Sequence, residues 1–332
     1  MSSKNIKVTV AILTFNGEKY LEEILKTLIK QKTKFSFSVL VIDSDSKDKT
    51  LDIVNKYDKL FSKKNKEFRV IKIKNTDFGH GKTRNLAIKE SKSEIVAFLT
   101  QDATPISGNW LTNLISAYDL DNKVVATFGP HIARENCNPV IKRDMENHFK
   151  NFGSNDIPVI QSIKKGEEIE GIVGFFSDVN ASIKKNYWLK HPYKEVSYAE
   201  DQIMGKEILL SGYKKAYCPM ASVFHSHTYP TSEYLGRYFD EYRGLKESIG
   251  FVDSVTILKI IPNAIKKFIN DACYIKAQEY PFKNLIKYLC QAFVMNVYRQ
   301  MGAYLGARYE KMPQFLINRI SMELSMKRRI NV

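Results

Sequence analysis

Cysteine is scarce in this 332-residue sequence, and long apolar runs are missing from it. The four cysteines form no Cys-x-x-Cys pair and are too few for a disulfide-stabilised fold, so we expect a reducing, cytoplasmic environment. No uninterrupted apolar stretch approaches the ~18 residues of a membrane-spanning helix. The apolar run near the N-terminus is short and lacks a cleavage site, which indicates a first strand and not a signal peptide.

Acidic residues are outnumbered by basic ones, 36 to 51, which gives a formal net charge of +15. Such a chain is attracted to anions, which include nucleic acid, an acidic membrane face and phosphorylated small molecules. The 44% hydrophobic content is that of an ordinary globular protein. The length suits one large domain with an appendage.

The first half of the sequence alternates strand-like and helix-like segments. Strands are predicted at 6–14, 37–43, 69–73, 94–100 and 123–128, with helices between the first two and at 83–91 and 108–119. This alternation is typical of an α/β fold in which helices cover both faces of a mainly parallel sheet. Ligands bind such sheets outside the carboxyl ends of the strands.

Polar residues gather at those predicted strand ends: Thr14-Phe15-Asn16-Gly17, Asp43-Ser44-Asp45-Ser46, the segment 75–81, and Gln101-Asp102. In the segment FLTQDATP, the apolar strand residues are followed within three positions by the carboxylate of Asp102. Two explanations fit it: a turn or helix cap, or a ligand for a divalent cation that neutralises a nucleotide diphosphate. Asp43 and Asp45 also have two explanations: they form a turn, or they contact a nucleobase and a ribose.

The stretch GHGKTRNLA, residues 79–87, places Lys82 and Arg84 at the predicted start of a helix. Anions are stabilised there by free N–H groups and the helix dipole, although a solvated basic face explains the same residues. It is not a Walker motif, because the required glycine spacing is absent.

After residue 130 the alternation loosens. We predict a strand and turn at 171–183, a helix at 199–211 that starts with Glu200-Asp201, and an extended segment at 214–227 that ends on His225-Ser226-His227. Residues two apart in an extended segment face the same side, so the imidazoles of His225 and His227 are expected to point into one site. If that site is functional, they could share a cation with Asp102. From about residue 231 the sequence predicts basic amphipathic helices, so a domain boundary is expected near residue 230.

In this order, the segments resemble the inverting glycosyltransferases of family 2, which have the GT-A fold, and are most similar to bacterial rhamnosyltransferases. The segments that carry the resemblance are VAILTFNGEKYLEEIL, VIDSDSKDKT, DFGHGKTRNLA, FLTQDATP, GFFSDVNASIKK, AEDQIMGKEILLSGYK and YCPMASVFHSH. They cover roughly residues 6–230. The resemblance implies a GT-A catalytic domain at 1–230 and a helical extension at 231–332.

The resemblance also implies roles for individual residues. Asp102 would bind Mg²⁺ or Mn²⁺ on the donor diphosphate, with a shell completed by His225 or His227, because Gln101 and Ala103 replace the further acids of the family pattern. Asp201 would be the catalytic base. The implied donor contacts are Thr14, Asn16, Asp43, Asp45, Lys82, Arg84 and Gln101. Asp178 and Asn180 are expected to hydrogen-bond sugar hydroxyls, although a turn explains them as well.

The implied reaction transfers rhamnose from dTDP-rhamnose to a hydroxyl of a saccharide or lipid-linked saccharide in bacterial cell-surface polysaccharide synthesis. A UDP-hexose donor is the alternative within the same fold. A basic protein that binds membrane or nucleic acid is the non-enzyme alternative, but acids at the strand ends would repel a nucleic-acid backbone. The predicted basic helices of residues 231–332 have three explanations of about equal weight: they bind the inner face of the membrane, they pack on the core, or they form a homo-oligomer contact.

Overall fold

The computed structural model describes residues 6–153, 156–164, 166–169 and 171–325, and its centre is an eight-stranded sheet. The strand order is β3-β2-β1-β4-β9-β6-β10-β8. The strands are β1 (Ile6–Thr14), β2 (Ser36–Asp43), β3 (Phe68–Lys72), β4 (Ile95–Thr100), β6 (Val124–Phe128), β8 (Val159–Gln161), β9 (Asn180–Lys184) and β10 (Lys214–Tyr217). β9 lies antiparallel to β4 and β6, and β8 antiparallel to β10, while the remaining pairs are parallel. The predicted mainly parallel sheet is confirmed.

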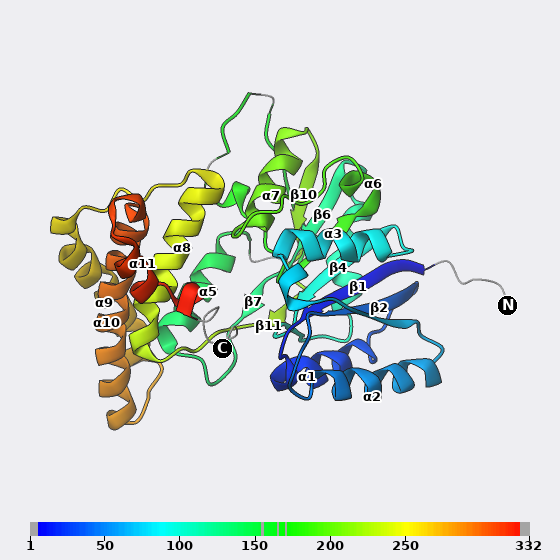
Figure 1. Cartoon of the computed structure of the whole chain (residues 1–332), viewed down its shortest axis with the longest axis horizontal. Helices are drawn as coiled ribbons and strands as arrows, with labels where there is room; N and C mark the ends of the chain where they lie inside the picture. The colour runs from blue at the N-terminus through cyan, green and yellow to red at the C-terminus, as the bar shows by residue number, and fades with distance from the viewer. Residues whose placement is uncertain (1–5, 154–155, 165, 170, 326–332) are drawn as a thin grey trace. The chain divides into compact units, whose positions relative to one another are not determined.

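Helices cover both faces of this sheet because the strands present apolar side chains on both sides. In β1, Val8, Val10 and Ile12 join one core and Ala11 joins the other. The first core is closed by α1 (Glu18–Leu28), α2 (Thr50–Lys63) and α4 (Trp110–Ile115), and the second by α3 (His80–Glu90), α6 (Lys185–Trp188) and α7 (Glu200–Leu210). In Figure 1, α1 and α2 lie on one side of β1 and β2, and α3 lies on the other.

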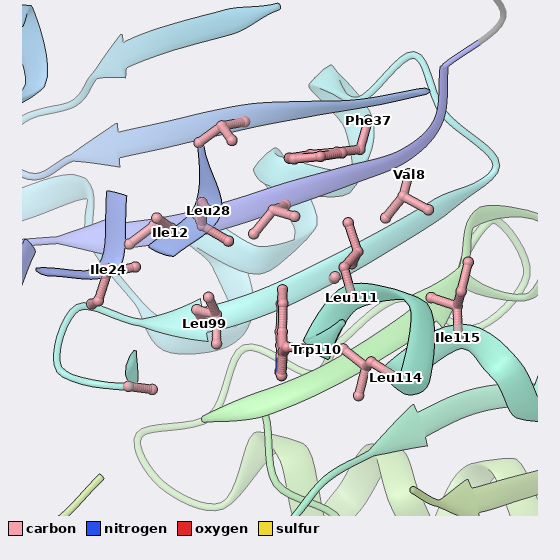
Figure 2. Close-up of a cluster of buried hydrophobic side chains, with 14 of the residues drawn as sticks. Val8, Ile12, Ile24, Leu28, Phe37, Leu99, Trp110, Leu111, Leu114 and Ile115 are labelled. Atoms are coloured by element: carbon pink, nitrogen blue, oxygen red, sulfur yellow. The ribbon is translucent and has the colours of Figure 1, made fainter. Parts of the chain in front are cut away.

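The first core shows how tightly α1 and α4 fix the central strands. Trp110 is fully buried and lies with Leu111 and Leu114 against Leu99 of β4 (Figure 2). Burying each side chain of this size contributes about 1.5–3 kcal/mol. The loops at the ends of β1 and β4 therefore start from rigid strands.

Some element boundaries differ from the predicted ones. The helix predicted at 83–91 begins at His80, so Lys82 and Arg84 both lie within its first turns. The strand predicted within 171–183 begins only at Asn180, since Gly171–Gly174 form a 3₁₀ turn. The helix predicted at 108–119 is α-helical from Trp110 to Ile115 and then tightens into a 3₁₀ segment.

A small sheet, β5-β11-β7, stands beside the large one. It consists of β5 (Thr104–Pro105), β11 (Val223–Phe224) and β7 (His131–Ile132), each two residues long. β11 pairs antiparallel with β5 and parallel with β7. This pairing brings residues that follow β4 next to residues that follow β11, although they are more than 100 positions apart in sequence.

The chain divides into two compact units. The first contains the sheets, and the second contains residues 135–144, 197–199 and those from His227 onward. The second unit is helical, with the first half of α5 (Pro139–Lys150), α8 (Tyr234–Ile249), α9 (Ile260–Ala277), α10 (Phe282–Gly306) and α11 (Gln314–Ile320). Its core includes Val140, Tyr234, Tyr238, Ile275, Ala292 and Met295. The expected C-terminal helices are present. Among the described residues, no helix combines the length and the apolar character needed to cross a bilayer.

Candidate functional site

The carboxyl ends of β1, β2 and β4 lie side by side. Thr14 is in register with Asp43, and Leu13 is in register with Thr100. The loops 14–17, 43–46 and 101–102 therefore emerge at one edge of the sheet, as the alternation of strands and helices predicts.

Asp43 organises the loop after β2. Its Oδ1 accepts hydrogen bonds from the hydroxyls of Thr14, at 3.2 Å, and Ser46, at 2.5 Å, and its Oδ2 accepts from the Ser46 N–H at 3.1 Å. A carboxylate has about four lone-pair positions, so three are used within the protein. Asp43 and Thr14 are both buried, Asp43 completely. The nucleobase contact predicted for Asp43 stays a prediction, with one lone-pair position left for it.

The exposed side chains of this edge are Asn16 and Asp45. Both have left-handed backbone, with φ of 49° and 68°, a conformation that Asn and Asp tolerate better than other non-glycine residues. Asn16 Oδ1 accepts from the Lys47 N–H at 2.8 Å, and the Asn16 N–H donates to Ser46 Oγ at 2.9 Å. The Asp45 carboxylate lies 2.7 Å from Lys47 Nζ at the surface. The loops after β1 and β2 are thus held together by hydrogen bonds, and the side chains of Asn16 and Asp45 remain exposed to solvent.

Gln101 joins the ends of β1 and β4. Its side-chain amide accepts from the Phe15 N–H and donates to the Phe15 carbonyl. A Cβ at Gly17 would lie 2.8 Å from Gln101 Oε1, so a larger residue there would displace this amide. Gln101 is therefore placed to shape the loop after β1.

Asp102, His225 and His227 form a candidate cation site. Their ligand atoms all lie within 4.8 Å of one another, and His225 Nε2 lies 3.6 Å from Asp102 Oδ1. The three-stranded sheet explains this proximity, since Thr104 pairs with Phe224 one residue before His225. One ion with bonds of about 2.1 Å separates adjacent ligand atoms by roughly 3.0–3.4 Å. The residues therefore fit a divalent cation after small side-chain rotations.

The first turn of α3 approaches another segment very closely. A Cβ at Gly81 would lie 2.2 Å from the Lys194 carbonyl, so only glycine fits. Asn85, one turn later, accepts from the Tyr193 N–H and donates to its carbonyl, both at 2.9 Å. Lys82 stays half-exposed, 3.9 Å from Asp77.

Arg84 is buried within a cluster of acids. Its Nε lies 3.0 Å from Asp178 Oδ2, and Nη1 donates to Glu200. The Tyr193 hydroxyl donates to Asp178 Oδ1 at 2.8 Å. Burial raises the pKa of Asp178 to about 6, against the lowering effect of Arg84. With about 7% and 0% of their side chains exposed, Arg84 and Asp178 face each other, and the donor contacts predicted for them stay predictions.

Asp201 stands at the start of α7, next to this cluster. It is half-buried, and its Oδ2 accepts from the Asp178 backbone N–H at 3.3 Å while Oδ1 accepts from the Gln202 N–H at 2.8 Å. Burial, followed by the charges of Glu200 and Asp178, raises the pKa of Asp201 to about 8. With this pKa the carboxyl is mostly protonated at neutral pH, and its ionised form is a stronger base than an ordinary carboxylate.

Asn180 serves the interior of the fold. Its Oδ1 accepts from the Trp110 indole N–H at 2.9 Å, and its Nδ2 donates to the Ala221 carbonyl at 2.6 Å. The residue is completely buried. The side-chain amide has no exposed atom, and the sugar contact predicted for Asn180 stays a prediction.

Two residues of the site edge were not singled out from the sequence. Tyr193 orients Asp178, and Arg134 contacts the loop that carries Asp102. Arg134 is one of 51 lysines and arginines, and nothing in its neighbours separates it from the others. Tyr193 follows His191-Pro192 in a loop without a recognisable motif.

Comparison with known proteins places the chain among glycosyltransferases. The family described as Glycosyl transferase family 2 matches residues 9–187, a range that contains Asp43 and Asp102 and ends before Asp201. The O-antigen chain rhamnosyltransferase RfbN of Salmonella typhimurium is 31% identical over 238 residues, 71% of each chain. The O-antigen chain rhamnosyltransferase WbaN of Salmonella anatum is 30% identical over 236 residues, 70% of each chain.

Solved structures support the fold. The mannosyltransferase PcManGT from Pyrobaculum calidifontis, in complex with GDP-Man and Mn²⁺, has a TM-score of 0.59 at 16% identity and covers 93% of this chain and 89% of its own. TarS 1–349 of S. aureus has a TM-score of 0.51 at 17% identity, with 92% and 91% covered. The strand order, the flanking helices and these neighbours agree with the expected GT-A architecture.

Proposed function

The chain belongs to glycosyl transferase family 2, and from this premise we propose that it transfers rhamnose from dTDP-rhamnose to a hydroxyl of a saccharide or lipid-linked saccharide in bacterial cell-surface polysaccharide synthesis. The similarity to two O-antigen chain rhamnosyltransferases over about 70% of each chain supports the sugar and the pathway class. The observation that carries the chemistry is the grouping of Asp102 with His225 and His227 at the edge where β1, β2 and β4 end.

The donor half of the reaction belongs to this edge. The loop held in shape by Asp43 and Thr14 presents Asn16 and Asp45 to the nucleoside. Asp102, His225 and His227 would hold a divalent cation, which would neutralise charge on the leaving diphosphate. Two imidazoles favour Mn²⁺ over Mg²⁺, since Mg²⁺ prefers an all-oxygen shell. The exposed Lys82, in the first turn of α3, is placed to contact phosphate oxygens.

The acceptor half requires a base, for which we assign Asp201. The acceptor O–H gives its proton to the Asp201 carboxylate, its oxygen attacks the anomeric carbon, and the bond to the diphosphate oxygen breaks with both electrons on the leaving group. One displacement of this kind inverts the anomeric configuration. Arg84, Asp178 and Tyr193 keep Asp201 and its neighbours in place, because the Asp178 N–H donates to Asp201.

Incubation with donors tests this assignment. Purified protein, Mn²⁺ and oligosaccharide or lipid-linked acceptors are combined with dTDP-rhamnose, UDP-glucose, UDP-GlcNAc or GDP-mannose, and nucleoside diphosphate release is measured. We expect dTDP-rhamnose to be consumed fastest and NMR to find the product's anomeric configuration opposite to the donor's. Faster turnover of a UDP-hexose would favour the alternative donor. No release from any donor would contradict the proposed activity.

A contact with the membrane surface is a second proposal, supported by α9. Ile261, Ile265 and Ile269 recur at four-residue spacing on this helix and are 44–55% exposed. Lysines lie nearby at 259, 266 and 276, and the only acid of α9, Asp271, is buried. An anionic lipid surface complements such a face, whereas a second copy would bring the same lysines together.

Vesicle sedimentation tests the membrane contact. We expect binding of the full chain to phosphatidylglycerol vesicles, weaker binding to phosphatidylcholine, and loss of binding for Ile265→Glu. Leu210→Glu changes an equally apolar, exposed residue of α7 and is the matched control. Equal sedimentation of both variants would contradict the proposal, and a concentration-dependent dimer lost in Ile265→Glu would assign the face to self-association.

A further inference from the structure

Arg134 lies two residues after the end of β7, beside the proposed cation site. Its side chain is only 13% exposed, although it is an arginine in a loop. Burial of a guanidinium is costly unless its donors are used, so its contacts indicate a purpose.

Those contacts reach both segments that carry the proposed ligands. Nη2 donates to the Asp102 carbonyl at 3.2 Å and to Thr104 Oγ1 at 2.8 Å, which holds the turn after β4. The Arg134 backbone N–H donates to Ser226 Oγ at 3.1 Å, and Ser226 stands between the two histidines. One residue therefore bonds to Asp102 itself and to the residue between His225 and His227.

The other terminal nitrogen of the guanidinium is anchored on α1, while the buried Nε has no hydrogen-bond partner among the described residues. Nη1 donates to the Glu23 carboxylate, with 3.1 and 3.3 Å to its two oxygens. The guanidinium carbon lies 4.1 Å from the centre of the Tyr20 ring. Because Glu23 balances the positive charge and the ring fixes the guanidinium plane, the side chain is held rigidly.

We propose that Arg134 is the positioning residue of the cation site: its guanidinium holds the Asp102 turn and its backbone N–H holds Ser226, so that the two segments stay at the spacing that one Mn²⁺ requires. This inference rests on the proposed function of that site. The role depends on the geometry of the guanidinium and not on its charge, since lysine cannot reach Asp102, Thr104 and Glu23 at once. Loss of outer-shell partners of this kind typically weakens metal affinity about 10–100-fold.

Binding of Mn²⁺ to the full chain provides the test. The free-ion EPR signal is titrated for wild type, Arg134→Lys and Arg134→Gln, without nucleotide and with dTDP, alongside thermal melting. We expect both substitutions to weaken Mn²⁺ binding by about 10-fold or more. Arg69→Lys is the matched control, because Arg69 bonds to the Glu90 carbonyl and carboxylate away from this site, and its affinity should equal wild type.

The charge-preserving variant separates two explanations. If Arg134→Lys binds Mn²⁺ and dTDP as wild type does while Arg134→Gln does not, charge alone matters and the positioning role is wrong. Ser226→Ala and Thr104→Val remove single partners of Arg134 and keep the test valid if the arginine variants do not fold. Wild-type affinity in every variant would overturn the inference. Failure of wild type itself to bind Mn²⁺ would overturn the cation site, and the inference with it.

Discussion

The side-chain amide of Gln101 forms two hydrogen bonds with the backbone of Phe15, one to its N–H and one to its carbonyl, as the backbone of a neighbouring strand would. Gln101 Oε1 accepts from the Phe15 N–H at 2.8 Å, and Nε2 donates to the Phe15 carbonyl at 3.1 Å. The position precedes Asp102, where the resemblance led us to expect a further acid. A carboxylate could accept from the N–H but could not donate to the carbonyl. The amide therefore links the loop after β1 to the residue that precedes Asp102.

We expect Gln101→Met to weaken dTDP binding by about 10-fold, because the loop after β1 loses both hydrogen bonds, each worth about 1 kcal/mol. Calorimetric titration measures the change. Gln31→Met is the control: Gln31 also bonds to backbone groups, at Ser107 and Leu111, but away from the strand ends. Equal loss of affinity in both variants would mean that general destabilisation, and not the loop, explains the effect.

Substitution of the proposed base should affect turnover and leave donor binding intact. We expect Asp201→Asn to lower kcat by about 10²–10⁴-fold, the usual contribution of a general base, with the affinity for dTDP unchanged. Because the carboxylate must be ionised, kcat/KM of the wild type should rise with pH through the Asp201 pKa of about 8. Glu207→Gln on the same helix is the control, since Glu207 pairs with Lys194 at the surface. A kcat within about 10-fold of wild type would remove Asp201 from the mechanism.

Asp201 should also make stability depend on pH. Its folded pKa of about 8 lies above the unfolded value of about 3.9. The folded state thus binds the proton more tightly, and the resulting stability is present at low pH and lost as pH rises from about 4 to 8. Thermal melting between pH 5 and 9 should show the Tm of wild type falling relative to Asp201→Asn. Parallel curves would indicate that the carboxyl ionises normally.

Asn180 should matter for stability and not for sugar recognition. Asn180→Ala leaves the Trp110 indole N–H and the Ala221 carbonyl without their partner, at about 1–3 kcal/mol each. We expect the free energy of unfolding in urea to fall by about 2–4 kcal/mol, with the KM for the donor unchanged under native conditions. Asn55→Ala, at an exposed position of α2, is the control and should change the free energy of unfolding by less than about 0.5 kcal/mol. A raised KM with normal stability would instead support the predicted sugar contact.

The sheet could be predicted from the sequence because its strands are strongly apolar and alternate with amphipathic helices. β1 was predicted with the bounds that the structure has. The residues at the strand ends could be named for the same reason, since parallel strands bring their carboxyl ends to one edge.

The partners of these residues could not be predicted. Arg84 follows two glycines at a helix start, which indicated an anion contact. Nothing local in the sequence indicates its ion pair with Glu200, which is 116 positions away. The role of Arg134 depends on β5, β7 and β11, whose two-residue strands are too short for any alternation to show. The second unit likewise includes residues 135–144, which precede the expected boundary near 230 by almost 90 positions.

Metal-dependent binding of a pyrimidine nucleoside diphosphate tests the central claim most directly. Wild type and Asp102→Ala are titrated calorimetrically with dTDP, UDP and GDP, with and without Mn²⁺. We predict that dTDP binds most tightly, that the binding requires Mn²⁺, and that Asp102→Ala abolishes the metal-dependent part while its melting temperature stays near that of wild type. Binding of dTDP to Asp102→Ala with unchanged affinity and unchanged Mn²⁺ dependence, or no binding of any nucleoside diphosphate to wild type, would contradict the account.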